Sequence, residues 1–204
     1  MNRAIFLDRD GVINSMVYNP EFGLVDSPAN PGEFELLPNA AEAVRIFNDL
    51  GFLVVVVSNQ PGIAKGKFSP ALLEAMTAKM LAGLAGGGAQ IDSVYYCMHH
   101  PDGRVAEYRM VCDCRKPKPG MILRAADDLD IDLSSSYLIG DGFIDIQAGE
   151  SAGVKTILVY PSSKYNICGE LAIRNVQPDH IVESLIEAAN VIRSTESVRK
   201  VENN

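Results

Sequence analysis

The sequence predicts an α/β fold in which helices cover a mostly parallel sheet. Short apolar segments alternate with amphipathic segments along the chain, which is the pattern of successive right-handed strand–helix–strand units. The apolar segments are continuous rather than alternating, and this is typical of strands buried on both faces of a parallel sheet. The chain has 204 residues, a length that suits one domain. We therefore expect a three-layer α/β/α sandwich.

The first predicted strand, residues 4–7, is a short apolar run that ends at two aspartates. Residues 14–37 follow; they are rich in Pro, Gly, Asn and Ser and show no sustained helical period. This segment is long for a structureless connection, so we expect it to be functional or partly ordered on the surface. Next, Pro38-Asn39 opens an amphipathic segment that ends at Gly51, which predicts a helix.

Residues 52–57 form the strongest predicted strand, because they are uncharged and mostly β-branched. Ser69 and Pro70 are an N-cap and a first-turn proline, and they predict a helix to about Gly83. The later predicted elements are strands at 91–97, 137–140 and 154–160 and helices at 121–129, 145–152 and 184–192. We expect a single domain over residues 1–194 without a large cap domain, followed by a polar tail, 195–204, that frays.

The composition excludes several classes of function. The net charge of -8 argues against a nucleic-acid or anionic-membrane partner, because phosphate contacts need a basic surface. No apolar run approaches the roughly 18 residues of a membrane span, and the apolar run at residues 4–7 is too short for the hydrophobic region of a signal peptide. We expect a cytoplasmic monomer with reduced cysteines, of which three cluster and Cys168 stands alone. Clustered cysteines in that compartment indicate metal rather than disulfides.

Polar side chains follow three of the predicted strands, where each strand ends. Asp8 and Asp10 follow the first, Ser58 follows the second, and Asp141 and Asp145 follow the fourth. Ligands of open α/β sheets bind beyond the carboxyl ends of the strands, so we expect these groups to converge. Carboxylates gathered at one point repel unless a cation neutralises them, and an all-oxygen set suits Mg²⁺. A solvated corner for the acid pair and a helix N-cap role for Asp141 remain open alternatives.

Arg115 and Lys116 are basic residues that precede two prolines. The prolines restrict the backbone and orient the basic side chains. A serine hydroxyl, a lysine and a metal around one point form a cradle for a transferring phosphoryl group, whose charge is spread over its oxygens.

A polar loop, residues 97–114, contains Cys97-x-His99 and Cys112-x-Cys114. Three thiolates and one imidazole make a closed tetrahedral set, which is the ligation of structural Zn²⁺. His100 is a competing imidazole that we place outside the set. Unliganded cysteines or a redox pair are the alternatives. Because a closed site has no open coordination position, we assign this zinc no catalytic role.

Four ordered motifs resemble those of the haloacid dehalogenase (HAD) superfamily of aspartate-nucleophile phosphatases. They are FLDRDGVIN, VVSNQ, RKPKPGM and IGDGFID. SNQPGIAKGKF and the zinc loop resemble more closely the branch that contains heptose 1,7-bisphosphate 7-phosphatases and histidinol-phosphate phosphatases. The resemblance extends from Ala4 to about Tyr160 and implies a Rossmann-like, HAD-like fold.

The resemblance also implies roles for individual residues. Asp8 would be the nucleophile that forms an aspartyl-phosphate, and Asp10 would act as general acid and then general base. Mg²⁺ would be held by Asp8, by the main-chain carbonyl of Asp10 and by Asp141, with Asp145 nearby.

The same motifs imply groups that hold the phosphate and the substrate. Ser58 and Lys116 would stabilise the phosphoryl oxygens. Asn59, Gln60 and Arg115 would help to bind the substrate.

The implied activity is hydrolysis of a phosphorylated sugar, namely the 7-phosphate of D-glycero-D-manno-heptose 1,7-bisphosphate in the synthesis of ADP-heptose for the lipopolysaccharide core. A histidinol-phosphate or other small-metabolite phosphatase is the alternative, and a non-catalytic zinc-stabilised binding module is a remote one. Residues 14–37 and Gly142 differ from the pattern of the heptose enzymes. Both differences lie at positions where we expect substrate specificity to be set.

Overall fold

The computed structural model describes residues 1–20, 23–161, 171, 173 and 176–202. Cys168 lies outside these described residues. Within them, no helix is both long and apolar enough to cross a membrane.

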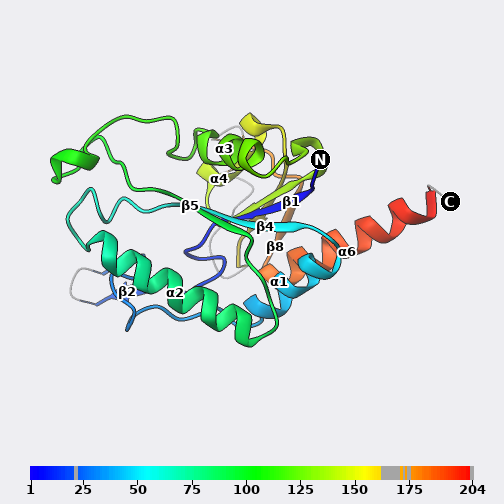
Figure 1. The fold of residues 1–204 in the computed structure, drawn as a ribbon, viewed down its shortest axis with the longest axis horizontal. Helices are drawn as coiled ribbons and strands as arrows, with labels where there is room; N and C mark the ends of the chain where they lie inside the picture. Colours follow the sequence, from blue (N-terminus) through cyan, green and yellow to red (C-terminus); the bar gives the residue numbers. More distant parts are fainter. Residues whose placement is uncertain (21–22, 162–170, 172, 174–175, 203–204) are drawn as a thin grey trace.

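A six-stranded parallel sheet forms the centre of the molecule, in the order β5-β4-β1-β6-β7-β8 (Figure 1). Its strands are β1 (Ala4–Leu7), β4 (Leu53–Asn59), β5 (Ser93–Cys97), β6 (Tyr137–Gly140), β7 (Lys155–Val159) and β8 (His180–Val182). The five predicted strands are thus confirmed, with bounds that differ by about two residues or fewer, the usual uncertainty of element ends. Strand β8 is an addition that the sequence patterns did not predict.

Helices cover both faces of the sheet and complete the three predicted layers (Figure 1). One face carries α1 (Ala40–Asp49), α2 (Pro70–Gly86) and α6 (Leu185–Glu202), and the other carries α3 (Gly120–Asp128) and α4 (Phe143–Ala152). The residues of β1 alternate between the two cores: Ile5 and Leu7 pack on the α1 side, and Ala4 and Phe6 on the α3 side. This explains the continuous apolar run, because a strand covered on both faces needs apolar side chains at every position.

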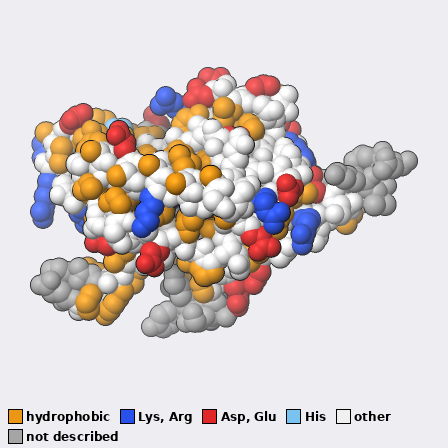
Figure 2. Space-filling model, turned by 60° about the horizontal axis from the view of Figure 1, so that its bottom comes forward, with side chains coloured by type: hydrophobic (Ala, Val, Ile, Leu, Met, Phe, Trp, Pro, Cys, Tyr) orange, Lys and Arg blue, Asp and Glu red, His pale blue; other side chains and the backbone are white. Residues whose placement is uncertain are grey.

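The segment 14–37 contains a short antiparallel hairpin of β2 (Val17–Asn19) and β3 (Leu24–Asp26), separate from the main sheet. The expected partial order on the surface is therefore confirmed. Tyr18, Leu24 and Val25 are more than half exposed, and Figure 2 shows hydrophobic side chains on the surface where the hairpin projects at the lower left.

Helix α6 corrects the predicted C-terminal end of the chain. We expected a helix ending near residue 192 and a frayed polar tail, but residues 195–202 continue the helix to Glu202. The tail prediction is wrong there because Glu196 is buried and pairs with Arg3 at 2.5 Å. The Arg3 guanidinium also lies 4.3 Å from the centre of the Phe52 ring. A partner 193 residues away thus stabilises a segment that reads as polar tail.

Candidate active site

Three carboxylates converge at the carboxyl edge of the sheet. Asp8 follows β1, Asp141 follows β6, and Asp145 lies in the first turn of α4. One oxygen of each lies within 4.8 Å of the others. The adjacency of β1 and β6 in the sheet produces this cluster, as expected from the rule on strand ends.

Two glycines make room for these carboxylates. Gly11 has a φ of 86°, a left-handed conformation that favours glycine, and a Cβ there would overlap the Asp141 carboxylate. A Cβ on Gly140 would overlap the side chain of Asp145. Any larger residue at either position would therefore push an aspartate out of the cluster.

Lys116 is the buried cation that compensates the negative charges of Asp8 and Asp145. Its side chain is 2% exposed, and its Nζ is 2.9 Å from Asp8 Oδ1 and 2.5 Å from Asp145 Oδ1. The ammonium donates its aligned hydrogen bond to the carbonyl of Val57 at 2.8 Å. Burial alone would lower the pKa of Lys116, but the negative charges of Asp145 and Asp8 outweigh it and raise that pKa. The lysine therefore stays charged.

The pKa of Asp145 is also raised, but for a carboxyl group this shift favours the neutral form. Burial, with a further contribution from the charge of Asp8, raises its pKa to about 6, against the lowering effect of Lys116. Its Oδ2 accepts a hydrogen bond from the backbone N–H of Gly142 at 3.0 Å, at the start of α4. The carboxylate thus sits at the positive end of a helix.

The cluster has the chemistry of a divalent-cation site. Oδ1 of Asp8 and Oδ1 of Asp145 are buried and receive no aligned hydrogen bond, although Lys116 lies within ion-pair distance of both. Buried oxygens in that state are costly unless a positive charge satisfies them. Three carboxylates offer the all-oxygen ligation that Mg²⁺ prefers, so the donor set fits the ion.

Asp10 does not join this cluster with its side chain. Its carboxylate is turned toward Arg9, Asn14 and Gln60, which donate hydrogen bonds to it at 2.8 to 3.2 Å. The sequence patterns did not single out Arg9 or Asn14. The available signal was an arginine placed between two aspartates directly after a strand buried on both faces.

The zinc loop brings its four predicted ligands together. Cys97, His99, Cys112 and Cys114 offer ligand atoms within 4.8 Å of one another. The sulfur–sulfur distances are 3.0 to 3.5 Å, and His99 Nδ1 lies 3.3 Å from Cys114 Sγ. These separations are too long for disulfides and somewhat shorter than the edges of about 3.3–3.8 Å in a Zn²⁺ tetrahedron with bonds of about 2.0–2.3 Å. Burial also raises the pKa of the Cys97 thiol, an effect that a bound cation reverses.

Comparisons with known proteins identify the family of the chain. Residues 113–188 match the HAD-hydrolase-like family. The chain is 46% identical over 161 residues to the D-glycero-β-D-manno-heptose-1,7-bisphosphate 7-phosphatase of Escherichia coli (strain K12), covering 79% of this chain and 80% of the relative. The Yersinia pestis protein of the same name is 38% identical over 94% of this chain and 95% of its own.

The chain belongs to the D-glycero-β-D-manno-heptose-1,7-bisphosphate 7-phosphatase family. The resemblance to HAD phosphatases that the motifs indicated is thus confirmed. The crystal structure of the D,D-heptose 1,7-bisphosphate phosphatase from B. bronchiseptica, complexed with magnesium and phosphate, has a TM-score of 0.76 and 32% identity, over 95% of this chain and 99% of that one.

In this member of the heptose bisphosphate phosphatase family, the Asn59 side chain contacts the backbone of Lys116. Its side-chain amide donates to the carbonyl of Lys116 and accepts from the N–H of Lys116, both at 3.1 Å. Gln60 is buried, and its amide donates to Asp10 at 2.8 Å and to Ser58 Oγ at 3.2 Å. Both residues therefore position other site groups. Their predicted contact with substrate stays a prediction.

Ser58 and Arg115 flank the same edge of the sheet. Ser58 lies near the end of β4 and is 1% exposed. Arg115 directly precedes Lys116, and its buried Nη1 has no hydrogen-bond partner among the described residues. A guanidinium nitrogen in this state is available to an anionic ligand.

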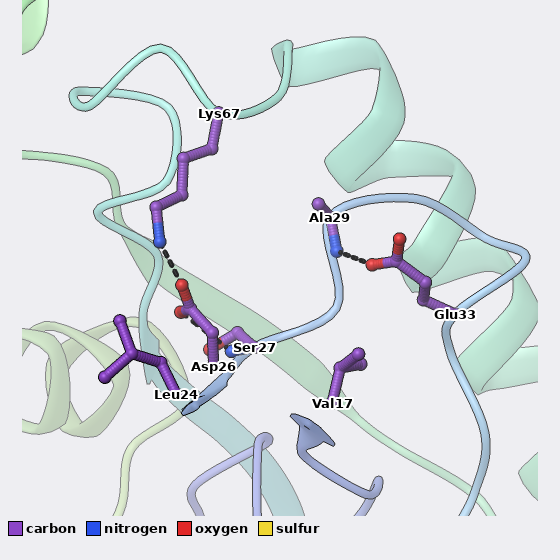
Figure 3. Close-up of a pocket in the computed structure, with 7 residues that line it drawn as sticks. All are labelled: Val17, Leu24, Asp26, Ser27, Ala29, Glu33 and Lys67. Atoms are coloured by element: carbon purple, nitrogen blue, oxygen red, sulfur yellow. Dashed lines mark hydrogen bonds and ion pairs between the residues drawn. The ribbon is translucent and has the colours of Figure 1, made fainter. Parts of the chain in front are cut away.

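The hairpin segment encloses a cavity of about 420 Å³. Figure 3 shows Lys67 paired with Asp26 on one side and Glu33 accepting a hydrogen bond from the backbone N–H of Ala29 on the other. The lining residues are Val17, Leu24, Asp26, Ser27, Ala29, Glu33 and Lys67. A smaller cavity shares Asp26 and Lys67 with it and reaches Gln60. The hairpin segment therefore lies next to Gln60, one of the residues that hold Asp10.

Proposed function

We propose that this protein is a Mg²⁺-dependent phosphomonoesterase that removes the 7-phosphate of D-glycero-D-manno-heptose 1,7-bisphosphate through an aspartyl-phosphate intermediate. One observation carries the chemistry: Asp8 lies at the end of a buried strand, in contact with the buried Lys116 and close to two further aspartates. The identity of up to 46% with phosphatases of that name supports the substrate.

In the first step, a carboxylate oxygen of Asp8 attacks phosphorus, and the bond between phosphorus and the sugar oxygen breaks. Asp10 donates a proton to the departing oxygen, so that the sugar leaves as an alcohol. Lys116 and Ser58 hold the phosphoryl oxygens, whose negative charge the ammonium and the hydroxyl stabilise.

In the second step, water attacks the phosphorus of the aspartyl-phosphate. Asp10, now a carboxylate, accepts the proton of that water. The bond between phosphorus and the Asp8 oxygen breaks, which releases inorganic phosphate and restores Asp8. One residue thus serves as acid and then as base.

The metal would be held by the carboxylates of Asp8, Asp141 and Asp145 and by the main-chain carbonyl of Asp10. When bound, Mg²⁺ neutralises charge on the phosphoryl oxygens. The magnesium and phosphate in the B. bronchiseptica relative support this assignment. The three cysteines and His99 would hold a structural zinc whose role is to place Arg115 and Lys116.

Steady-state kinetics on two substrates test the proposed substrate. We expect kcat/KM for heptose 1,7-bisphosphate to exceed that for histidinol phosphate by at least about 100-fold, a ratio that specific polar contacts readily produce. The opposite order would show that the protein is a histidinol-phosphate phosphatase on the same machinery.

The Asp8→Asn variant tests the nucleophile. An amide cannot form the acyl-phosphate, so we expect turnover to fall on the order of 10³-fold or more, while zinc content and fold are retained. Asp49→Asn is the matched control, because Asp49 is an exposed residue of α1 outside the site. Near-normal activity of Asp8→Asn would refute the nucleophile and leave the binding-module alternative.

The cytoplasmic location and the monomeric state remain predictions from the sequence. Gel filtration with light scattering measures the second directly.

A further inference from the structure

Arg9 is a fully buried arginine in a position where charge is costly. Its relative exposure is 0%, and its guanidinium lies 5.7 Å from the centre of the Phe34 ring and 5.6 Å from that of Tyr96. Phe34 belongs to the 14–37 segment and Tyr96 to β5, so two separate elements enclose the side chain. A buried charge of this kind persists only where it is paired and hydrogen-bonded.

The partner that compensates Arg9 is the Asp10 carboxylate. Arg9 Nη2 lies 2.9 Å from Oδ1 and 3.1 Å from Oδ2, and Arg9 Nε lies 3.2 Å from Oδ1. Asn14 donates to Oδ1 at 2.9 Å, and Gln60 donates to Oδ2 at 2.8 Å. Gln60 also accepts from Arg9 Nη2 at 3.1 Å, which ties the cradle together.

Every group that faces the Asp10 oxygens in this cradle is a hydrogen-bond donor. Arginine N–H groups and side-chain NH₂ groups cannot accept a proton from a carboxylic acid. The cradle is therefore complementary to the carboxylate, which is the form that Asp10 takes after it has given its proton to the leaving oxygen. Donors aimed at charge that develops during a step lower the barrier of that step.

We propose that Arg9 is a positioning residue that holds Asp10 and stabilises its carboxylate as the leaving group is protonated. This inference rests on the proposed function, since it takes Asp10 as the acid. In the step concerned, the proton moves from Asp10 to the ester oxygen as the phosphorus–oxygen bond breaks and the bond to Asp8 forms. The resulting negative charge on Asp10 is met by the guanidinium.

The leaving group provides the test. A sugar alkoxide must be protonated to depart, whereas p-nitrophenolate departs as a stable anion without an acid. For Arg9→Met we expect kcat/KM to fall about 10–100-fold on heptose 1,7-bisphosphate, the range for residues that orient a reacting group. On p-nitrophenyl phosphate we expect less than about a 3-fold change, because general acid catalysis contributes little there.

The matched control is Arg124→Met. Arg124 also lies over a tyrosine ring, that of Tyr95 at 5.9 Å, but its side chain is 75% exposed and lies on α3 outside the site. Both activities of this variant should equal those of the wild type. Arg9→Lys keeps the positive charge but loses the planar guanidinium with its several N–H donors. Its kcat/KM on the sugar ester should therefore lie between those of the wild type and Arg9→Met. If Arg9→Met does not fold, the split between the two esters in Arg9→Lys tests the proposal.

A double variant separates positioning from general damage. With Asp10→Asn in place, adding Arg9→Met should cost no further activity on the sugar ester, because Arg9 acts through Asp10. An equal loss on both esters, no loss on either, or an additive double variant would each overturn the proposal.

Failure of the proposed function looks different. A wild-type protein that cleaves glycerol phosphate and p-nitrophenyl phosphate but not heptose 1,7-bisphosphate would refute the proposed substrate. Glycerol phosphate would then replace heptose 1,7-bisphosphate as the alkyl ester in the test of Arg9→Met. A wild-type protein that cleaves none of these esters would overturn both proposals.

Discussion

Lys116 is a buried cation whose two carboxylate partners come from different elements, since Asp8 follows β1 and Asp145 lies in the first turn of α4. Asp8 and Asp145 lie 2.9 and 2.5 Å from its ammonium. Removing the ammonium leaves two buried negative charges side by side. The residue therefore has a structural consequence as well as its proposed contact with phosphate.

Replacing this ammonium tests its structural part. Lys116→Met should lower the unfolding free energy of the metal-free protein by about 3–5 kcal/mol, the usual result of removing one partner of a buried pair. Added Mg²⁺ should restore part of that loss, because the cation compensates the same carboxylates. Urea unfolding with and without Mg²⁺ measures both effects.

Lys118→Met is the control, since Lys118 is half-exposed and pairs with the exposed Asp113. We expect no measurable shift in its midpoint. A Lys116→Met protein as stable as the wild type without metal would contradict the charge balance described above.

The raised pKa of Asp145 predicts how metal binding depends on pH. Its value of about 6 lies above the ordinary 3.8, so the group is protonated below about pH 6 and ionised above it. A proton competes with a cation for a carboxylate. The Mg²⁺ dissociation constant should therefore rise by up to about tenfold per pH unit as the pH falls below about 6.

Isothermal titration calorimetry at several pH values between about 5 and 7.5 measures this dependence. Asp145→Asn should bind Mg²⁺ more weakly at the upper end and lose most of the dependence. Equal affinity of the wild type over the whole range would exclude Asp145 as a ligand.

At the scale of elements, the zinc loop is a polar segment held at both ends by ligand pairs. Cys97 ends β5, and Cys114 directly precedes the basic residues of the site. The loop has little apolar burial of its own: of its residues, Val105, Met110 and Val111 are exposed. Metal ligation is then the main source of its order, as in small zinc domains.

Adjacent histidines allow a matched test of this ligation. His99→Ala removes a ligand, so zinc content should fall well below about one ion per chain, and the thermal midpoint should fall by several degrees. His100→Ala should keep its zinc, because the His100 ring lies outside the cluster and accepts a hydrogen bond from the backbone N–H of Asp102. Equal zinc content in the two variants would contradict the assignment.

At the scale of the whole molecule, the C-terminal helix closes the fold onto the N-terminal strand. Arg3 next to β1 contacts Glu196 on α6 and the carbonyl of Leu50 after α1. These contacts join the two ends of the chain to the same face of the sheet. Helix α6 is therefore attached to the fold as far as Glu196.

Glu196→Ala tests this closure. It leaves the Arg3 guanidinium without its carboxylate, and the expected loss of unfolding free energy is about 1–3 kcal/mol. The kinetic constants should not change, because Glu196 is remote from the carboxyl edge of the sheet. Glu74→Ala on α2, an exposed position, should leave stability unchanged. If the C-terminal segment frayed instead, Glu196→Ala and Glu74→Ala would be equally stable, and this result would contradict the prediction.

The sequence by itself determined the sheet, most of the helices and the identities of the candidate ligands. Continuous apolar runs are specific for strands covered on both faces, and the rule on strand ends then gathers Asp8, Ser58 and Asp141. The four candidate zinc ligands could be predicted because they form two pairs, and the members of each pair are close together in the sequence. Local signals of this kind survive without any knowledge of the tertiary contacts.

Only the tertiary structure decided the state of charged residues whose partners are distant in the chain. The sequence patterns did not single out Arg9, yet Gln60, 51 residues away, and two aromatic rings bury it against Asp10. The sequence predicts that Glu196 belongs to a polar tail, but in the structure Glu196 forms an ion pair with Arg3. Strand β8 has three residues and is held by its pairing with β7. In each case burial is stabilised by a contact between remote segments, and no local pattern records such a contact.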